Sequence, residues 1–272
     1  ILISGGGLAG LTARLAFQRL GIATELIDLA PTFAKPENDT SLVLTSNATH
    51  VLHELGLSSV VDRSNRLDAW TIQDVQGKKL GGVNFAELKD TREGGGNPTI
   101  SIKYNDLLSK LQEAGGPKNS ENAKMRMAAG VEGIEPSMVN IGAVTASFTT
   151  KALKPKVYNL VVGADGVASK VREAAVGPIG SKNVSVAFPG WGYWSCSVPS
   201  KLCEELTEQH RMVEVWAPGI RFGFVPMASS ETFCYATVNH SRPVPPTKTP
   251  RERASAMAEH CQSMRAVGGG AV

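Results

Sequence analysis

The sequence lacks any apolar stretch near the roughly 18 to 20 residues that a membrane-spanning helix requires. It also lacks a run of about five or six basic residues, and its formal net charge is only +3 over 272 residues. Such a chain gives no electrostatic indication of a nucleic acid or an anionic membrane as partner. No basic region precedes the apolar N-terminal residues, as it does in a secretory signal. We therefore expect no nucleic-acid partner, no transmembrane segment and no secretion.

Cysteine is scarce, and its spacing is irregular. The four cysteines are Cys196, Cys203, Cys234 and Cys261, a pattern that fits neither a zinc knuckle nor a disulfide framework. An H-E-x-x-H metal motif and a G-x-S-x-G nucleophile motif are both missing, which leaves metalloenzyme and hydrolase chemistry without support. We expect reduced thiols, no metal ligands and an intracellular, cytoplasmic location.

Glycine, in contrast, is abundant, with 28 residues, and part of it forms a motif near the N-terminus. A short apolar strand is expected over residues 1–4, followed by a G-x-G-x-x-G loop and a helix. In such a loop the first glycine permits the turn, the second admits a pyrophosphate and the third lets helix and strand pack closely. The loop residues predicted to bind a dinucleotide are Gly5, Gly7, Leu8, Ala9 and Gly10.

An acidic residue follows this loop at the end of the second expected strand. Asp28 is placed to accept hydrogen bonds from ribose hydroxyl groups and to repel a 2′-phosphate. The strand, loop, helix, strand order therefore favours FAD or NAD over NADP. The alternative is that the glycines form a structural turn and that Asp28 merely ends a strand.

A second motif carries a family resemblance. Residues 159–172 read NLVVGADGVASKVR, a buried strand that runs into a glycine-flanked carboxylate and then a helix. This string resembles the second fingerprint, G-A-D-G-x-x-S-x-V-R, of the p-hydroxybenzoate hydroxylase-like FAD-dependent monooxygenases, the aromatic-ring hydroxylase family. The resemblance implies that Asp165 and Gly166 lie near the FAD pyrophosphate and ribityl chain. A plain strand-to-helix turn is the alternative, because Asp is also a good turn residue.

Two cofactor positions depart from the family pattern. Tyr104 stands where the family carries Arg or Gln toward the cofactor, and Asp28-Leu29 stands where it has Glu-Arg. The resemblance still implies FAD as the bound cofactor and NAD(P)H as the electron donor.

The segment from residue 190 onward resembles the family's substrate domain. Trp194, Phe222 and Phe224 are candidate walls of an aromatic substrate pocket, although aromatic residues at alternating strand positions also form ordinary sheet cores. Ser195 follows Trp194 where the related branch carries an arginine.

The expected fold class is α/β (α+β). A Rossmann-like FAD-binding domain with a parallel sheet and a small three-stranded β-meander is expected over 1–66 and 99–177, and an antiparallel-sheet substrate domain over 67–98 and 178–272. Strands are expected at 1–4, 23–28, 71–75, 79–85, 127–134, 143–149, 157–162, 184–198, 211–216, 221–225 and 232–239. Helices are expected at 47–55, 105–113, 200–209 and 251–264, with a loop at 115–123.

The resemblance also implies a reaction. NAD(P)H reduces FAD, O2 adds to the flavin as a C4a-hydroperoxide, and one oxygen atom passes to an aromatic or other electron-rich small molecule. No side chain is assigned as a catalytic residue. The family's third fingerprint, a G-D-A-x-H-like string, is missing, so we expect that the C-terminal end of the FAD domain is absent. A truncated noncatalytic dinucleotide-binding protein and a related flavoprotein such as an epoxidase stay open, and the sequence specifies neither the substrate nor the oligomeric state.

Overall fold

The computed structural model describes residues 1–32, 40–88, 97–116, 119–120, 123–243, 249, 251–252 and 255. The chain forms two compact units. Unit 1 comprises Ile1–Glu37, His53–Val60 and Tyr104–Val186, and unit 2 comprises Asn38–Leu52, Val61–Lys103 and Ala187–Val272. Both units interleave along the sequence, as the predicted domains do; the functional division into a cofactor domain and a substrate domain stays a prediction.

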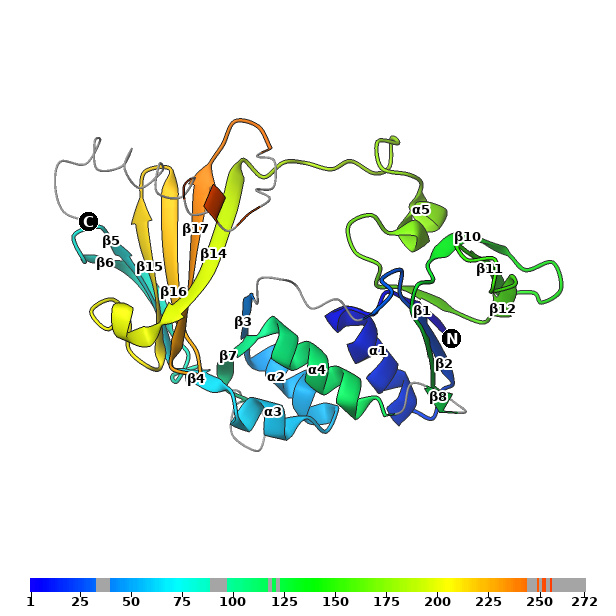
Figure 1. Cartoon of the computed structure of the whole chain (residues 1–272), viewed down its shortest axis with the longest axis horizontal. Coiled ribbons are helices and arrows are strands. Elements are labelled where there is room, and N and C mark those ends of the chain that lie inside the picture. The colour runs from blue at the N-terminus through cyan, green and yellow to red at the C-terminus, as the bar shows by residue number, and fades with distance from the viewer. Residues whose placement is uncertain are drawn as a thin grey trace. The chain divides into compact units, whose positions relative to one another are not determined.

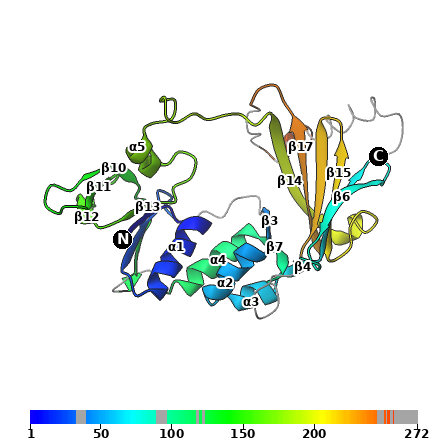
Figure 2. The ribbon, with the colours of Figure 1, turned by 180° about the vertical axis from the view of Figure 1, so that it is seen from behind.

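Unit 1 is built on a mainly parallel sheet with the strand order β13-β1-β2-β9-β8 (Figures 1 and 2). Its strands are β1 (Leu2–Ser4), β2 (Thr24–Ile27), β8 (Asn119–Ser120), β9 (Ala123–Arg126) and β13 (Val161–Gly163). β1 pairs in parallel with β2 and β13, β2 pairs in parallel with β9, and only β8 runs antiparallel to its neighbour. The two N-terminal strands are buried along their whole length, as expected for apolar strands in a parallel sheet.

Two helices of unit 1 pack together through leucines. α1 (Leu8–Arg19) follows β1 directly, and α4 (Tyr104–Ala114) packs against it. The buried leucines recur at helical spacing on one face of each helix, which explains the contact. They are Leu11, Leu15, Leu107, Leu108 and Leu111.

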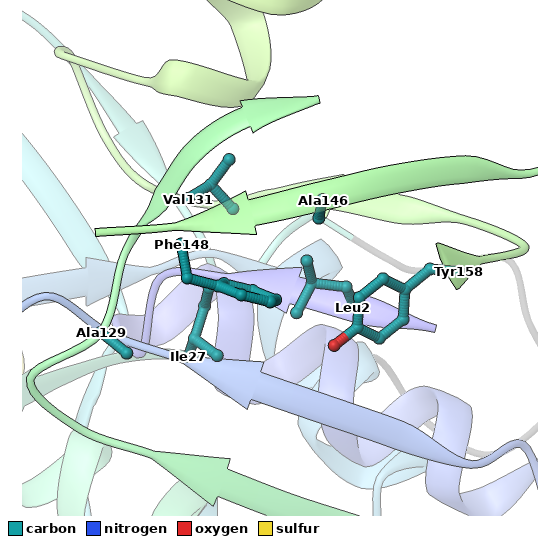
Figure 3. Close-up of a cluster of buried hydrophobic side chains, with 7 residues drawn as sticks. All are labelled: Leu2, Ile27, Ala129, Val131, Ala146, Phe148 and Tyr158. Carbon is teal, nitrogen blue, oxygen red and sulfur yellow. The ribbon is translucent and has the colours of Figure 1, made fainter. Parts of the chain in front are cut away.

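A three-stranded antiparallel meander completes unit 1, together with α5 (Lys170–Val176). Its strands are β10 (Val131–Pro136), β11 (Val144–Phe148) and β12 (Lys156–Tyr158). Side chains from this meander and from the parallel sheet share one core (Figure 3). The buried members of that core are Leu2, Ile27, Ala129, Val131, Ala146, Phe148 and Tyr158. The predicted combination of a parallel sheet and a β-meander is confirmed.

A buried carboxylate joins these two layers. Glu25 in β2 accepts hydrogen bonds from Arg126 Nε at 2.6 Å, Lys156 Nζ at 2.7 Å and Tyr158 Oη at 2.9 Å. Burial alone raises the pKa of Glu25, but the three donors outweigh burial and lower that pKa from 4.5 to about 2. The charged carboxylate therefore ties β2 to both β9 and β12.

Unit 2 is built on a six-stranded sheet with the order β14-β17-β16-β15-β5-β6. Its strands are β5 (Ala69–Asp74), β6 (Lys79–Asn84), β14 (Trp191–Pro199), β15 (Arg211–Ala217), β16 (Ile220–Pro226) and β17 (Glu231–Asn239). All neighbours are antiparallel except β15 and β5, which run parallel. The predicted antiparallel second sheet is confirmed, except that β15 and β5 pair in parallel.

A smaller sheet and a second core lie in the same unit. β7 (Thr99–Lys103) pairs with β3 (Ser41–Leu44) and β4 (Asn65–Leu67), and the short helices α2 (Ser46–Glu54) and α3 (Ser58–Asp62) lie between β3 and β4 in the sequence. In this core, side chains of the large sheet pack against Leu67 of β4 and against Met227, which follows β16. Its buried members are Leu67, Met212, Val225, Met227 and Phe233.

Several predicted element bounds were wrong. The expected helix 200–209 is a single 3-10 turn over Ser200–Leu202, after which the buried side chain of Cys203 turns toward the sheet. The expected strand 184–198 begins only at Trp191, because Pro189 offers no N–H group and Gly190 has a φ of +85°. The predicted helix 251–264 lies largely outside the described residues.

Three further predicted segments, two strands and a loop, differ from the observed elements. The expected strand 157–162 is split, because β12 pairs with the meander and β13 with the parallel sheet. The expected strand 127–134 begins only at Val131, and a turn precedes it in which Ala128 has a φ of +56° and its N–H bonds to Ala30 O. The expected loop 115–123 also leads into β9, a strand that the sequence did not indicate.

Candidate functional site

The first and third glycines of the N-terminal loop are fixed by close backbone approach. Gly5 has a φ of +107°, and a Cβ atom added there would lie 2.2 Å from the carbonyl oxygen of Ala164. A Cβ atom on Gly10 would lie 1.8 Å from the carbonyl oxygen of Gly5. Neither position has room for any side chain, so the loop packs directly against the helix and against the strand end that carries the second motif.

The second glycine, Gly7, faces open space. It is the N-cap of α1, and the nearest atom to a Cβ added there is the hydroxyl oxygen of Tyr104 at 4.0 Å. N–H groups of the first helical turn, including those of Leu8 and Ala9, have no partner within the helix. The turn also carries no acidic residue and no capping side chain. The helix dipole and these N–H groups together suit an anion such as a pyrophosphate.

Asp28 lies against the same loop. Its Oδ2 atom accepts a 2.5 Å hydrogen bond from the N–H of Gly6, and its Oδ1 atom accepts one of 2.8 Å from the N–H of Ala30. These bonds hold a half-buried carboxylate beside the glycines at the end of β2. Each carboxylate oxygen has more than one acceptor direction, so the group also suits the hydroxyl groups of a ribose.

The second motif meets the first at one sheet edge. β13 and β1 are parallel neighbours, so the loops that follow them share the carboxyl edge of the sheet, where α/β proteins bind nucleotides. The N–H of Ala164 bonds to Ser4 O at 2.7 Å, and Gly166 turns the chain with a φ of +78°.

Asp165 has local partners of its own. Its Oδ1 atom accepts from Ser169 Oγ at 2.5 Å, and its Oδ2 atom accepts from the N–H of Lys170 at 2.8 Å. Ser169 in turn caps α5 by accepting from the N–H of Arg172 at 2.9 Å. The carboxylate therefore has a structural task at the start of α5, whatever else it binds.

The nine predicted cofactor-binding residues are brought together in unit 1. They are the loop residues Gly5, Gly7, Leu8, Ala9 and Gly10, together with Asp28, Tyr104, Asp165 and Gly166. Asp28 contacts the loop at Gly6, the Tyr104 hydroxyl lies near Gly7, and Ala164 and Asp165 lie against Gly5.

A polar network in unit 2 was not predicted. Glu214 is only 3% exposed, and its carboxylate accepts hydrogen bonds from Trp216 Nε1 at 2.9 Å and from the hydroxyl of Tyr235. Arg221 Nη1 lies 3.7 Å from Glu214 Oε1, and Tyr193 stacks on the ring of Tyr235 with centroids 5.9 Å apart. Burial, followed by the neighbouring Glu214, raises the pKa of Tyr235 above its ordinary value. The sequence signal is weak, because Glu214 is a single acidic residue among apolar neighbours in β15, and its partners Arg221 and Tyr235 lie on two other strands.

The predicted pocket residues occupy the other face of the same sheet. Trp194 and Phe222 both pair in register with Ala236, and Phe224 pairs with Cys234, so these side chains share one face. Tyr235 lies between Cys234 and Ala236 in β17, so its side chain points to the opposite face. The prediction that Trp194, Phe222 and Phe224 line a pocket stays a prediction.

Two absences were found within the described ranges. No three His, Cys, Asp or Glu side chains there are arranged to hold a metal ion. No helix in that part of the chain is long and apolar enough to cross a membrane.

Comparison with known proteins gives relatives in sequence and in fold, while no protein-family model matches the chain. It is 28% identical over 240 residues to the aurachin C monooxygenase/isomerase of Stigmatella aurantiaca, which covers 87% of this chain and 56% of that protein. It is 26% identical over 245 residues to the 3-hydroxybenzoate 6-hydroxylase of Polaromonas naphthalenivorans, covering 89% and 57% respectively. A crystal structure of a point variant of Klebsiella pneumoniae HpxO complexed with FAD superposes with a TM-score of 0.76 at 16% identity, over 96% of this chain and 61% of that one. The chain thus spans somewhat more than half the length of the curated relatives, and the expected resemblance and fold are confirmed.

Proposed function

Because this chain is a relative of the FAD-dependent monooxygenases, we propose that the whole protein inserts one oxygen atom from O2 into an aromatic or other electron-rich small molecule, with NAD(P)H as electron donor. The observation that carries the proposal is the meeting of two nucleotide-binding motifs at one edge of the parallel sheet. Gly5 of the first motif has room for no side chain because it lies against Ala164 of the second. A generic turn does not require this contact.

Different site residues would bind different parts of the cofactor. Leu8, Ala9 and the helix start at Gly7 would hold the pyrophosphate, while Gly5 and Gly10 keep the backbone close enough to do so. Asp28 would hold a ribose. Bound FAD supplies the redox chemistry, accepting electrons from NAD(P)H and passing them to O2.

The remaining two positions complete the proposed cofactor site. Tyr104 would meet the cofactor beside Gly7, because its hydroxyl is the nearest group to the open side of that glycine. Gly166, which has no side chain, would leave room for the cofactor at the second loop. Asp165 shapes that loop through its bonds to Ser169 and Lys170.

Substrate contact is proposed for the aromatic face of the large sheet, at Trp194, Phe222 and Phe224. Flat apolar side chains suit an aromatic substrate, and the names of relatives, among them 3-hydroxybenzoate 6-hydroxylase, support that class. In the FAD-loaded whole protein, NADH oxidation stimulated by 3-hydroxybenzoate as a probe should show a raised KM in Phe222→Leu. Tyr235→Phe, on the opposite face, is the matched control. An unchanged KM in Phe222→Leu with a raised one in Tyr235→Phe would assign the substrate to the Glu214 face instead.

An intracellular, cytoplasmic location is also proposed. Three of the four cysteines, Cys196, Cys203 and Cys234, are free thiols, as is usual where the surroundings are reducing. Thiol alkylation and mass spectrometry of the protein from its native cells test this, because an oxidising compartment would yield disulfide-bonded cysteines that resist alkylation.

Titration with FAD tests the cofactor site directly. Asp28→Asn keeps the side-chain shape but removes the charge that attracts the ribose hydroxyls, so the Kd for FAD should rise roughly tenfold. Glu173→Gln is the matched control, because Glu173 lies on the surface of α5 and its carboxylate forms an exposed ion pair with Lys170. Equal affinities for both variants would refute the assigned role of Asp28, and a folded parent chain with no affinity for FAD would refute the site as a whole.

A further inference from the structure

Three cysteines of unit 2 gather on one part of the large sheet. Cys196 in β14 lies directly opposite Cys234 in β17, in the antiparallel register. Cys203 follows the 3-10 turn after β14, and its Sγ atom is 4.0 Å from that of Cys234. All three are free thiols. Residues that are distant in sequence are thus brought within reach of one another by strand pairing.

The geometry of the facing pair suits a covalent bond. Directly opposed residues on antiparallel strands have Cα atoms about 4.5 or 5.5 Å apart, depending on the hydrogen-bonding position. Both values fall inside the range of roughly 4.4 to 6.8 Å seen for disulfides. Opposed side chains also project from the same face. The Cα separation of a directly opposed pair such as Cys196 and Cys234 is therefore compatible with a disulfide.

The two thiols differ in environment. Cys196 is exposed, whereas Cys234 is half-buried and Cys203 is buried. A hydrogen bond with Cys234 lowers the pKa of Cys196 from 9.0 to about 6, more than burial raises it. The same contact raises the pKa of Cys234. The exposed member of the pair is therefore the one that more readily becomes a thiolate, the reactive form of cysteine.

A metal site does not explain this cluster. Among the residues that the structure describes, these thiols do not form a group arranged to hold a metal ion. An ordinary core role suits Cys203, since buried cysteine behaves as a small apolar side chain. It does not suit Cys196, an exposed residue on a strand directly opposite a second cysteine.

We propose that Cys196 and Cys234 form an oxidisable dithiol, which hydrogen peroxide converts into a cross-strand disulfide. The Cys196 thiolate attacks one peroxide oxygen, the O–O bond breaks, and a sulfenic acid forms with release of hydroxide, which takes up a proton to give water. The sulfur of Cys234 then attacks the sulfenic sulfur, the S–O bond breaks, and the Cys234 proton leaves with the hydroxide as a second water. Two thiols lose two electrons in total, and one peroxide is reduced.

Cys203 stands beside the pair as an exchange partner. Its sulfur lies 4.0 Å from the sulfur of Cys234. Attack on that sulfur would exchange the Cys196–Cys234 disulfide for a Cys203–Cys234 disulfide. The first bond forms at Cys196 because that thiol is exposed and more readily ionised, so Cys203 is dispensable for it. This proposal does not depend on FAD binding or on oxygenase activity.

Thiol counting and mass spectrometry of the oxidised chain test the proposal. The reduced chain, treated with hydrogen peroxide at neutral pH, should lose two of its four thiols and the mass of two hydrogens. Digestion should yield one peptide pair joined through Cys196 and Cys234, and dithiothreitol should restore both thiols. The oxidation rate should rise with pH through the pKa of Cys196, about 6.

Variants separate the roles of the four cysteines. Cys203→Ser and Cys261→Ser should oxidise as the parent does, whereas Cys196→Ser should lose the disulfide. If a variant fails to fold, the disulfide-linked peptides of the oxidised parent chain still identify which cysteines are bonded. Addition of oxygen to Cys196 without loss of a second thiol, or a disulfide that involves Cys203 or Cys261 as the first product, would overturn the proposal.

Discussion

At the scale of single residues, the glycine loop depends on backbone contacts that a side chain would break. Gly10 is the clearest case, because a Cβ atom there meets the carbonyl oxygen of Gly5 at 1.8 Å, and a backbone oxygen cannot swing aside as a flexible side chain can. The requirement comes from the approach of helix to loop. It exists whether or not a cofactor is bound.

Gly10→Ala should therefore lower both stability and flavin affinity. We expect the free energy of unfolding to fall by about 1 to 3 kcal/mol, as for other overpacked sites. Urea denaturation followed by circular dichroism measures it. Gly81→Ala is the matched control, since a Cβ added to Gly81 meets nothing within 4 Å. Equal effects of the two substitutions would show that the approach at Gly10 is not tight.

At the scale of secondary-structure elements, sequence patterns succeeded where the signals were local. The opening strand, helix and strand were predicted within about two residues, because apolar runs, glycines and Asp28 mark them in order. β9 was missed, because only its pairing with β2, about a hundred residues earlier, makes it a strand. The same reason hid the Glu214 network, whose partners Tyr235 and Arg221 come together only through the sheet register.

The candidate site likewise contains features with a local sequence signal and features without one. The loop of Gly5, Gly7 and Gly10 and the position of Asp28 at the end of the second strand could be read from a short stretch of sequence, and their cofactor role stays a prediction. The local bonds of Asp165 to Ser169 and Lys170 could not, because they depend on how tightly the turn before α5 closes.

The link between β2 and its neighbours predicts a pH dependence of stability. The pKa of Glu25 is lowered to about 2 in the folded chain from an ordinary value of 4.5. Its contribution is therefore present above pH 4.5 and is lost as the pH falls toward 2. We expect on the order of 2 kcal/mol, after allowing for the solvent that screens Arg126 and Lys156.

Denaturant unfolding at pH 7 and at pH 3 measures this contribution. Glu25→Gln should be less stable than the parent at pH 7, and the difference should shrink at pH 3, where the unfolded parent takes up a proton. Glu173→Gln, which removes a surface carboxylate, should show no such convergence. A constant difference between Glu25→Gln and the parent at both pH values would contradict the assigned ion pairs.

At the scale of the whole molecule, two compact units are interleaved along the chain, and each holds a candidate site. Unit 1 carries the nine proposed cofactor residues, and unit 2 carries both the aromatic face and the thiol pair. Because of this interleaving, the chain leaves and re-enters unit 1.

The most direct test of the account is the flavin content of this chain. The purified protein is incubated with FAD, desalted, and its visible flavin absorption compared with its protein concentration, while circular dichroism reports folding. The account predicts yellow protein with about one FAD per chain. A folded but colourless chain would contradict the claim that the residues of this chain suffice to bind FAD.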